Sequence, residues 1–464
     1  MASRMKRDDM KKDGADAKDE VFETSAGIEI LEKKTKISAV STVIFSGIAL
    51  LSDGYNASIV GNMNIIFGVL YPADVFTHAI KTRFSNAFLI GEIVGQLGFG
   101  FLIDKIGRKA GVFLTTALLI FGIILSAAAH GTTLLGMFWM LIVARGIAGV
   151  GAGGEYPVCG VSATEAADET AGVRKHRGFL IGMVGDFMID FGFVLGGIVP
   201  LIVMAAFHAV GPDQTAHFKE GIWRTCFALG LVLPLFVFYF RWKMINSTAF
   251  RKNAMKKRIP YLLVLKRYWP RLIGTAVCWF LYDFVSYPFG LFSSTIISQL
   301  EVNSTPVKDI GYGTLINAFY LPGCVLGAWS MDRIGRKKTQ FLGFFLQAIL
   351  GFILGGALGP IQKVFPLFVV LYGIFVSLGE FGPGVATILI SGESYPTAVR
   401  GHMLGLSAAV GKAGAAIGTQ VFLPIQDSFP NTFKGTQAVF VIGSAFSLVG
   451  AIVTWFLIPE VFHI

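Results

Sequence analysis

Twelve long runs of apolar residues, separated by short polar segments, make up most of the chain. Each run approaches or exceeds the about 20 residues with which an α-helix crosses the hydrocarbon core of a bilayer. The runs lie near residues 38–57, 84–103, 110–129, 134–158, 179–205, 222–242, 269–298, 311–331, 339–357, 364–391, 402–423 and 436–458. This pattern predicts an all-α polytopic membrane protein with twelve transmembrane helices.

The polar segments between the runs differ in charge. Most of the 39 lysines and arginines lie before the first run or after an even-numbered run, and the alternate segments contain few. Positive charge marks the cytoplasmic side of a membrane protein. We therefore expect both termini, and the long basic segment after the sixth run, to be cytoplasmic.

The second half of the chain repeats the first. Residues 104–109 read Asp-Lys-Ile-Gly-Arg-Lys after the second run, and residues 332–337 read Asp-Arg-Ile-Gly-Arg-Lys after the eighth. Two six-helix halves around a central site are the organisation of parallel-repeat transporters. The predicted parts are a cytoplasmic tail over 1–37, a six-helix bundle over 38–242, a cytoplasmic loop over 243–268, a second six-helix bundle over 269–458 and a cytoplasmic end over 459–464.

Composition supports a membrane protein and argues against a nucleic-acid binder. Hydrophobic residues are 54% of the chain and charged residues 15%, whereas soluble domains are about one quarter charged. The net charge of +10 is concentrated in the segments that set topology, so we expect contact with the lipid bilayer and none with nucleic acid. The four cysteines lie in apolar runs without metal-site spacing and are expected to be small buried residues rather than disulfide partners.

A carboxylate lies in the middle of the seventh apolar run, at Asp283. An ionisable residue there costs about 2.5–3.5 kcal/mol on insertion scales and marks an ion or substrate pathway by default. Trp279 and Tyr287 precede and follow it by four residues, so the three side chains share one helix face. We interpret this face as a binding site. The alternative is an acid that only pairs with a neighbouring helix.

Two further charged residues, Arg145 and Glu155, lie within the fourth run. Arginine keeps its charge at physiological pH, so a buried Arg145 needs a carboxylate or an anionic ligand. We expect it near Asp53 of the first run, where it would tune the proton affinity of that acid. Asp53, Glu155 and Asp283 are therefore candidate proton-coupling residues. Purely structural pairing is the alternative for the first two.

The fifth and eleventh runs also contain charged residues. Lys412 is surrounded by small residues, and it either attracts a phosphate group or extends toward water near Arg400. Asp186 and Asp190 are four residues apart and would repel each other if both were ionised. We expect Asp190 to contact substrate. In the tenth run, Glu380 either binds a hydroxyl group or caps a polar cavity.

The motifs resemble those of a known family. The two Asp-x-x-Gly-Arg-Lys loops are similar to the major facilitator superfamily signature. Residues 145–157 (Arg-Gly-Ile-Ala-Gly-Val-Gly-Ala-Gly-Gly-Glu-Tyr-Pro) look like the fourth helix of phosphate:proton symporters, and the seventh-run triplet and residues 405–414 resemble the same family. The resemblance covers all twelve runs. It implies a major facilitator fold, and a Tyr156 hydroxyl that donates to phosphate; an ordinary packed aromatic is the alternative for Tyr156.

Three departures from the phosphate symporter pattern favour a larger substrate. Asn56 replaces a second acid after Asp53, a fifth-helix glutamine has no counterpart, and Gly384 replaces a tenth-helix asparagine. Residues 52–56, 188–193 and 280–284 are instead similar to the glycerophosphoinositol permease branch, which takes up glycerophosphodiesters. The chain is therefore identified as a member of that branch.

Charged residues at the ends of the predicted helices form a candidate cytoplasmic gate. As latches between helices they would hold an outward-open state, through carboxylates at helix N-termini and arginine–carboxylate pairs. The alternative is that they only anchor the topology. The candidate gate residues are Asp104, Arg108, Glu165, Asp332, Arg336, Glu393 and Arg400.

The resemblance implies a proton-coupled symporter in the plasma membrane, expected to be a monomer. The predicted substrate is an anionic or zwitterionic phosphodiester such as glycerophosphoinositol or glycerophosphocholine. The expected substrate-binding residues are Arg145, Tyr156, Asp190, Trp279, Asp283, Tyr287 and Lys412.

Other functions are less well supported by the sequence. We find no catalytic triad, paired-cysteine metal site or nucleotide motif, so we expect neither an enzyme nor a cofactor beyond the coupling proton. Inorganic phosphate is the nearest alternative substrate, and a non-transporting nutrient receptor is an alternative of another class. A neutral sugar as substrate is disfavoured, because it does not require two cations within the membrane.

Overall fold

The computed structural model describes residues 44–106, 108–168, 177–211, 214–242, 261–300 and 305–460. The predicted tail 1–37 lies outside these residues, as do residues 243–260 of the predicted central loop and 461–464 of the predicted C-terminal end. The side chains of Asp104, Arg108 and Glu165, three of the candidate gate residues, also lie outside the described part.

The described residues form helices joined by turns, without a strand. The N-terminal half contains a helix over 44–70 and then α2 (His78–Ile106), α3 (Arg108–Ala127), α4 (Leu134–Asp168), α6 (Arg177–Val184), α7 (Asp186–Ala206), η1 (Gln214–His217), α8 (Glu220–Leu229) and α9 (Val232–Trp242). The C-terminal half contains α11 (Tyr261–Leu291), α12 (Ser293–Leu300), α13 (Pro306–Ala318), α14 (Tyr320–Arg333), α15 (Arg336–Gly356), α16 (Leu358–Gln362), α17 (Phe365–Gly379), η2 (Glu380–Gly384), α18 (Val385–Glu393), α19 (Thr397–Asp427) and α20 (Thr432–Leu457).

Eleven helical segments among the described residues are long and apolar enough to cross a membrane. The helix over 44–70 precedes them, which gives the twelve predicted segments. Several spans consist of two shorter helices, because the chain departs from regular α-helix within them. The fifth span divides at Gly185 into α6 and α7, and the tenth contains a π-helical turn, η2, between α17 and α18.

Two predicted boundaries differ from the structure. The first helix continues to residue 70, past the predicted end at 57. Its asparagines interrupt the apolar run but are buried and bonded, because Asn62 donates to the Gly196 carbonyl (2.9 Å) and Asn64 to the Ser85 hydroxyl (2.9 Å). Helix α11 begins at Tyr261, inside the predicted loop 243–268.

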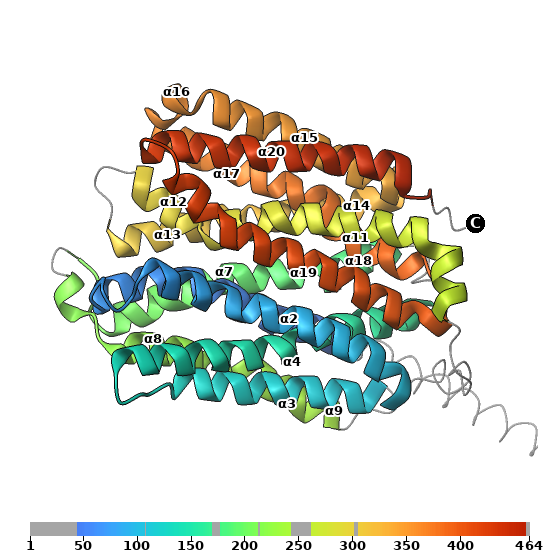
Figure 1. The fold of residues 1–464 in the computed structure, drawn as a ribbon, viewed down its shortest axis with the longest axis horizontal. Helices are drawn as coiled ribbons and strands as arrows, with labels where there is room; N and C mark the ends of the chain where they lie inside the picture. Colours follow the sequence, from blue (N-terminus) through green and yellow to red (C-terminus); the bar gives the residue numbers. More distant parts are fainter. Residues whose placement is uncertain are drawn as a thin grey trace, which may run out of the picture.

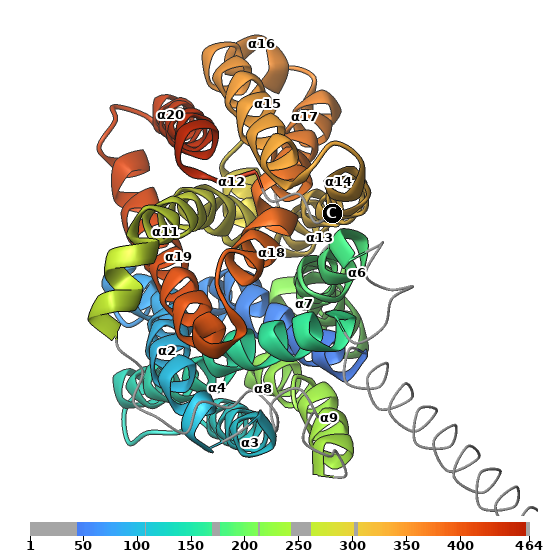
Figure 2. The same cartoon turned by 90° about the vertical axis from the view of Figure 1, so that its right-hand side faces the viewer.

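The helices run side by side along the long axis of the molecule (Figure 1). Viewed at right angles to this, the N-terminal half (blue to green) and the C-terminal half (yellow to red) separate into two bundles (Figure 2). Helix α4 packs on α2 and α3 in one half, and α11 and α15 pack on α20 in the other. Between the halves, α2 packs on α19, α7 on α13 and α6 on α14.

Large apolar side chains cover the outside of the bundle, as expected of a surface that faces lipid. Ile202, Trp242 and Phe456 are more than half exposed. The inside holds buried charged residues, among them Asp53, Arg145 and Asp283. The polar residues that interrupt the apolar runs of the sequence therefore lie inside the bundle.

Close contact between α2 and α4 depends on glycine. A side chain at Gly153 of α4 would meet the backbone oxygen of Glu92 on α2, and one at Gly149 would meet that of Phe88. Backbone atoms of two packed helices cannot move aside as a flexible side chain can. Small residues at such contacts are what allow membrane helices to pack closely.

We predict that Gly153→Ala destabilises the purified protein by about 1–3 kcal/mol, the usual cost of overpacking. The apparent Tm in detergent should fall accordingly. Gly98→Ala on α2 is the matched control, because nothing lies within 4 Å of a side chain built there. Equal Tm values for the two variants would contradict the proposed packing constraint.

Candidate functional site

A cavity lies between the two halves. Its lining comes from α4 and α7 of the N-terminal half and from α11, α14, η2, α18 and α19 of the C-terminal half. The lining residues are Tyr156, Asp186, Ile189, Asp190, Phe193, Trp279, Tyr282, Asp283, Ser286, Tyr287, Tyr320, Glu380, Gly384, Thr387, Ile388 and Lys412. Its volume of about 30 Å³ is enough for roughly two water molecules.

One side of the cavity is built around a buried ion pair. Lys412 Nζ of α19 lies 3.2 Å from Asp283 Oδ2 of α11, and both side chains are at most 2% exposed. Lys412 also donates to the Tyr287 hydroxyl and lies above the rings of Tyr287 (3.9 Å) and Tyr156 (5.1 Å). The other Asp283 oxygen, Oδ1, has no hydrogen-bond partner among the described residues. This set is called the lysine site below.

The spacing on α11 explains half of the lysine site. Trp279, Asp283 and Tyr287 are successive members of one i, i+4 series and all line the cavity, as their shared face predicts. Gly411 makes room for Trp279, because a side chain there would contact the indole ring. The small residues around Lys412 therefore bring α19 close to α11.

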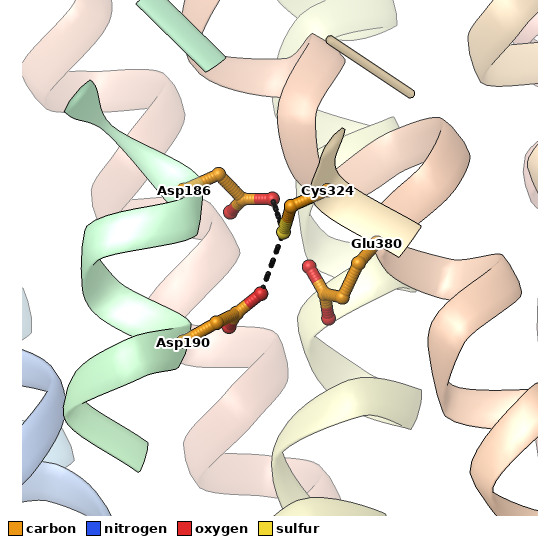
Figure 3. Close-up of side chains that lie close together, drawn as sticks. All are labelled: Asp186, Asp190, Cys324 and Glu380. Carbon is orange, nitrogen blue, oxygen red and sulfur yellow. Dashed lines mark hydrogen bonds between the residues drawn. The ribbon is translucent and has the colours of Figure 1, made fainter. Parts of the chain in front are cut away.

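The other side of the cavity is acidic. Asp186 and Asp190 of α7 point toward Cys324 of α14 and Glu380 of η2 (Figure 3). One ligand atom from each of the four residues lies within 4.8 Å of the others, and all four residues are buried. The Cys324 thiol lies 2.7 Å from Asp190 Oδ2 and 3.3 Å from Asp186 Oδ2. These four residues are called the acidic cluster.

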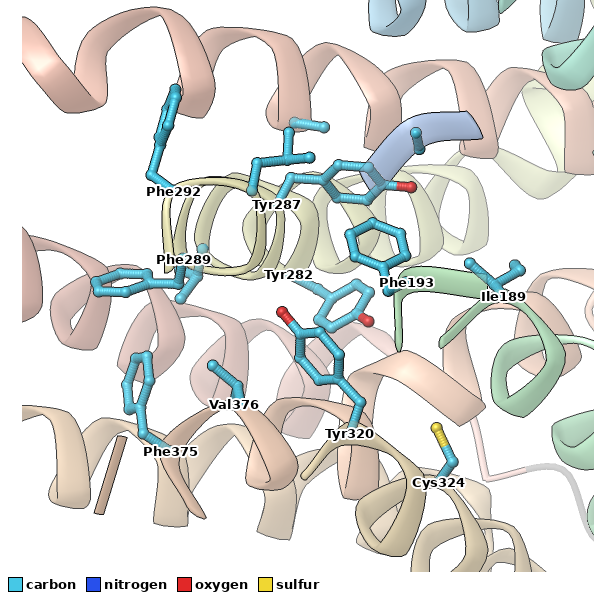
Figure 4. Packing of buried hydrophobic residues seen from close by; sticks show 14 of the residues in the cluster. Ile189, Phe193, Tyr282, Tyr287, Phe289, Phe292, Tyr320, Cys324, Phe375 and Val376 are labelled. Atoms are coloured by element: carbon cyan, nitrogen blue, oxygen red, sulfur yellow. The ribbon is translucent and has the colours of Figure 1, made fainter. Parts of the chain in front are cut away.

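Glu380 is held by α11 of its own half. Tyr282 donates to Glu380 Oε2 (2.5 Å) and Ser286 donates to Oε1 (2.9 Å). Tyr282 and Ser286 are again four residues apart, but on a different face of α11 from Asp283. The aromatic wall between the two sides contains Phe193, whose ring meets those of Tyr287 (5.9 Å) and Tyr320 (6.1 Å) edge to face (Figure 4).

A separate polar group lies within the N-terminal half. Arg241 of α9 pairs with Glu155 of α4 at 2.6 Å, and the hydroxyls of Thr115 and Thr116 each donate to the same Glu155 oxygen at 2.9 Å. Arg241 is only 4% exposed. Arg241 therefore lies inside the bundle, as the predicted bundle 38–242 implies, with its charge paired by the Glu155 carboxylate.

The expected contact between Arg145 and Asp53 is also not what the structure shows. Arg145 donates to the backbone oxygen of Asn56 and lies above the Phe88 ring (4.5 Å). Both Asp53 carboxylate oxygens are buried without a hydrogen-bond partner among the described residues. Asp53, Arg145 and Glu155 do not line the cavity, whereas Tyr156, Asp190, Trp279, Asp283, Tyr287 and Lys412 do.

Sequence reasoning missed Glu92. This acid of α2 is 1% exposed, and its Oε2 has no partner among the described residues. Its position inside the second apolar run is the same signal that identified Asp283. Cys324 was expected to be a small buried residue in an apolar run. Its thiol instead lies between two carboxylates, and with Cys226 and Cys278 it is a free cysteine of the described part.

Three candidate gate residues meet at one end of the bundle. Asp332 of α14 accepts hydrogen bonds from the backbone N–H groups of Gly178 (3.0 Å) and Phe179 (2.8 Å), at the N-terminus of α6 in the other half. Arg336 lies 3.6 Å from Asp332 and 3.5 Å from Glu393. Arg400, at the start of α19, is buried.

Comparison with known proteins identifies the family. A family model described as "Sugar (and other) transporter" matches residues 39–259 and 244–464. The chain belongs to this family of the major facilitator superfamily. It is therefore a multi-pass membrane transporter and not an enzyme.

The relatives include transporters of several phosphorus-containing compounds. The chain is 42% identical to glycerophosphoinositol permease 1 of Candida albicans, over 92% of this chain and 79% of that protein. It is also 42% identical to glycerophosphoinositol transporter 1 of Saccharomyces cerevisiae, over 92% and 80%. Inorganic phosphate transporter PT2 of Toxoplasma gondii is 29% identical, over 80% and 63%.

A solved structure shows the fold. The proton:xylose symporter XylE bound to 6-bromo-6-deoxy-D-glucose matches with a TM-score of 0.74 and 17% identity, over 91% of this chain and 96% of that one. The predicted fold, twelve helices in two six-helix bundles of the major facilitator type, is confirmed. The predicted resemblance to glycerophosphoinositol permeases is confirmed as well.

We predict that Arg241→Met alone destabilises the protein by about 3–5 kcal/mol, because it removes the cation 2.6 Å from the buried Glu155 carboxylate. Adding Glu155→Met should restore most of the loss, since the carboxylate that this cation neutralised is then removed as well. The apparent Tm of the three proteins measures this. A double variant as unstable as the single one would show that the ion pair is not the reason.

Proposed function

We propose that the protein is a proton-coupled uptake transporter of the plasma membrane, with glycerophosphodiesters as its substrates and alternating access as its mechanism. Relatives named as glycerophosphoinositol and glycerophosphodiester transporters, which match nearly the whole chain, support the substrate class. The observation that carries the proposal is the ion pair between Asp283 and Lys412 in the wall of the cavity.

This ion pair links a proton to an anion. Lys412 is the cation of the cavity lining, and Asp283 already neutralises it. A proton on Asp283 removes that partner and leaves the ammonium group to attract a phosphodiester. Conversely, an anion bound to Lys412 favours the protonated form of Asp283. The two ligands therefore bind with positive coupling, because each removes the ion-pair partner that opposes binding of the other.

Cotransport of a proton also removes an electrical penalty. A phosphodiester carries one negative charge, and an inside-negative potential opposes its entry by about 2.3 kcal/mol per 100 mV. One proton makes the transported complex neutral. More than one would let the potential drive accumulation.

Hydrogen bonds join the two halves on both sides of the cavity. Asp332 bonds α14 to α6 at one end, and Asn86 of α2 donates to Gln420 of α19 (2.6 Å) toward the other. A space of about 30 Å³ is too small for a glycerophosphodiester. We therefore propose that each end opens in turn as the two halves rock, and that the halves separate around the bound substrate.

We predict that Asp283→Asn abolishes the accumulation of radiolabelled glycerophosphoinositol driven by a pH gradient in proteoliposomes. The asparagine side chain does not bind and release a proton, so the pH gradient can no longer drive transport. Lys412→Met should weaken binding by about tenfold or more, the cost of removing a charge-assisted hydrogen bond. Glu220→Gln, half exposed outside the cavity, is the control and should accumulate substrate normally.

Two results would overturn the proposal. Gradient-driven accumulation retained by Asp283→Asn would remove its coupling role. Inorganic phosphate that competes with the wild-type protein as well as unlabelled glycerophosphoinositol would point instead to phosphate as the principal substrate. A proper fold of each variant is checked by its apparent Tm.

A further inference from the structure

We propose that the acidic cluster is the head-group subsite of the cavity, and that it binds the hydroxyl groups of a polyol ring while the phosphodiester lies at the lysine site. This inference rests on the proposed function and deepens it, because it assigns an orientation and a head-group class to the substrate. The candidate ligand is a glycerophosphodiester whose second alcohol is a polyhydroxylated ring such as inositol.

The cavity has two chemically opposite sides on one helix. Trp279, Asp283 and Tyr287 lie on the face of α11 toward Lys412, and Tyr282 and Ser286 lie on the face toward Glu380. Both sets line the same space. A ligand that fills it therefore meets a cation on one side and carboxyl groups on the other.

The acidic side exists because of two local features of the tenth span. Helix α17 passes into the π-helical turn η2 at Glu380, and such turns re-aim side chains and are frequent at functional sites. A side chain at Gly384 would contact the Glu380 and Asp186 carboxylates. Because Gly384 has no side chain, carboxyl groups from both halves of the protein can meet beside it.

The acidic cluster is suited to hydroxyl groups and not to phosphate. No lysine or arginine among the described residues lies in the cavity lining except Lys412, so a phosphate placed among the three carboxyl groups would have no cation beside it. Hydroxyl groups both donate and accept, and a ring with several of them can bond to several carboxyl oxygens at once.

An unused acceptor in the lining independently indicates a ligand. Asp283 is 1% exposed, and its Oδ1 lacks a hydrogen-bond partner within the described part of the chain. A buried acceptor without a partner costs about 1–3 kcal/mol. A hydroxyl group of the ligand, next to the phosphate that Lys412 binds, would supply the missing bond.

The hydrogen-bonding capacity of the cavity also favours a polyol over a quaternary ammonium group. Trimethylammonium attracts carboxylates and aromatic faces but donates no hydrogen bond. Placed here, it would cover Asp186, Asp190 and Glu380 with methyl groups that add no hydrogen bond to them. A site that hydrogen-bonds a hydroxylated ligand discriminates strongly against an analogue that lacks the hydroxyls.

The test compares two diesters with the same charge. Glycerophosphoinositol and glycerophosphomethanol both carry one phosphodiester charge, and only the first has a polyol ring. Tracer counterflow in proteoliposomes measures the half-saturation concentration of each ester. The pH is equal on both sides of the membrane, so that a defect in proton-driven accumulation does not affect the measurement. The variants are Asp190→Asn and Glu380→Gln, with Glu220→Gln as the control.

We expect each variant to raise the half-saturation concentration of the inositol ester by about tenfold, because a charge-assisted hydrogen bond is lost. Half-saturation for the methanol ester should change by less than about twofold. Glu220→Gln should leave both values unchanged. In the wild-type protein, glycerophosphocholine should compete with the inositol ester less well than the inositol ester itself.

Other outcomes separate the two proposals. If the variants weaken both esters equally, the head-group assignment is wrong and the proposed function stands. If they weaken only competition by glycerophosphocholine, the cluster binds a cationic head group, and the polyol assignment is again wrong. If the wild-type protein exchanges neither ester, both the proposed function and the subsite are wrong.

Discussion

The ion pair between Asp283 and Lys412 is the interaction on which the functional architecture depends. Two charges buried in the centre of a bundle are costly to desolvate, and breaking such a pair by removing one partner leaves an uncompensated charge. Two events lower the free-energy cost of separating this pair. A proton can neutralise Asp283, or an anion can replace it beside Lys412, and a symporter requires both.

The remaining polar features are placed relative to this pair by the packing of the helices. Helix α11 presents Asp283 to α19 and Tyr282 to η2, so that one helix organises both the lysine site and the acidic cluster. The acids of α7 come from the opposite half of the protein. Any movement of one half against the other therefore changes the distance between groups that we propose to bind the same ligand, which would couple occupancy to conformation.

Much of this arrangement follows from sequence, and what does not has physical reasons. The apolar runs predicted the helices, and i, i+4 spacing predicted the face shared by Trp279, Asp283 and Tyr287. The partner of Lys412 was not predicted, because the rotation of α19 against α11 is set by packing over many residues. Asp332 was expected to interact with a helix N-terminus, but the helix was not predicted, since the partners are backbone N–H groups of α6, which no side-chain pattern displays.

A polar contact that crosses between the halves at one end is weak. Asp332 interacts with the N-terminus of α6 in the other half, an interaction usually worth about 0.3–2 kcal/mol, whereas Arg336 and its carboxylate partners all lie in the C-terminal half. Within a half, backbone meets backbone at Gly149 and Gly153 of α4, and such packing cannot yield in small steps. Backbone also meets backbone between the halves, at Gly61 of the helix over 44–70 and Leu291 of α11. We therefore expect the halves to separate first at the Asp332 end, with each six-helix bundle moving as a body.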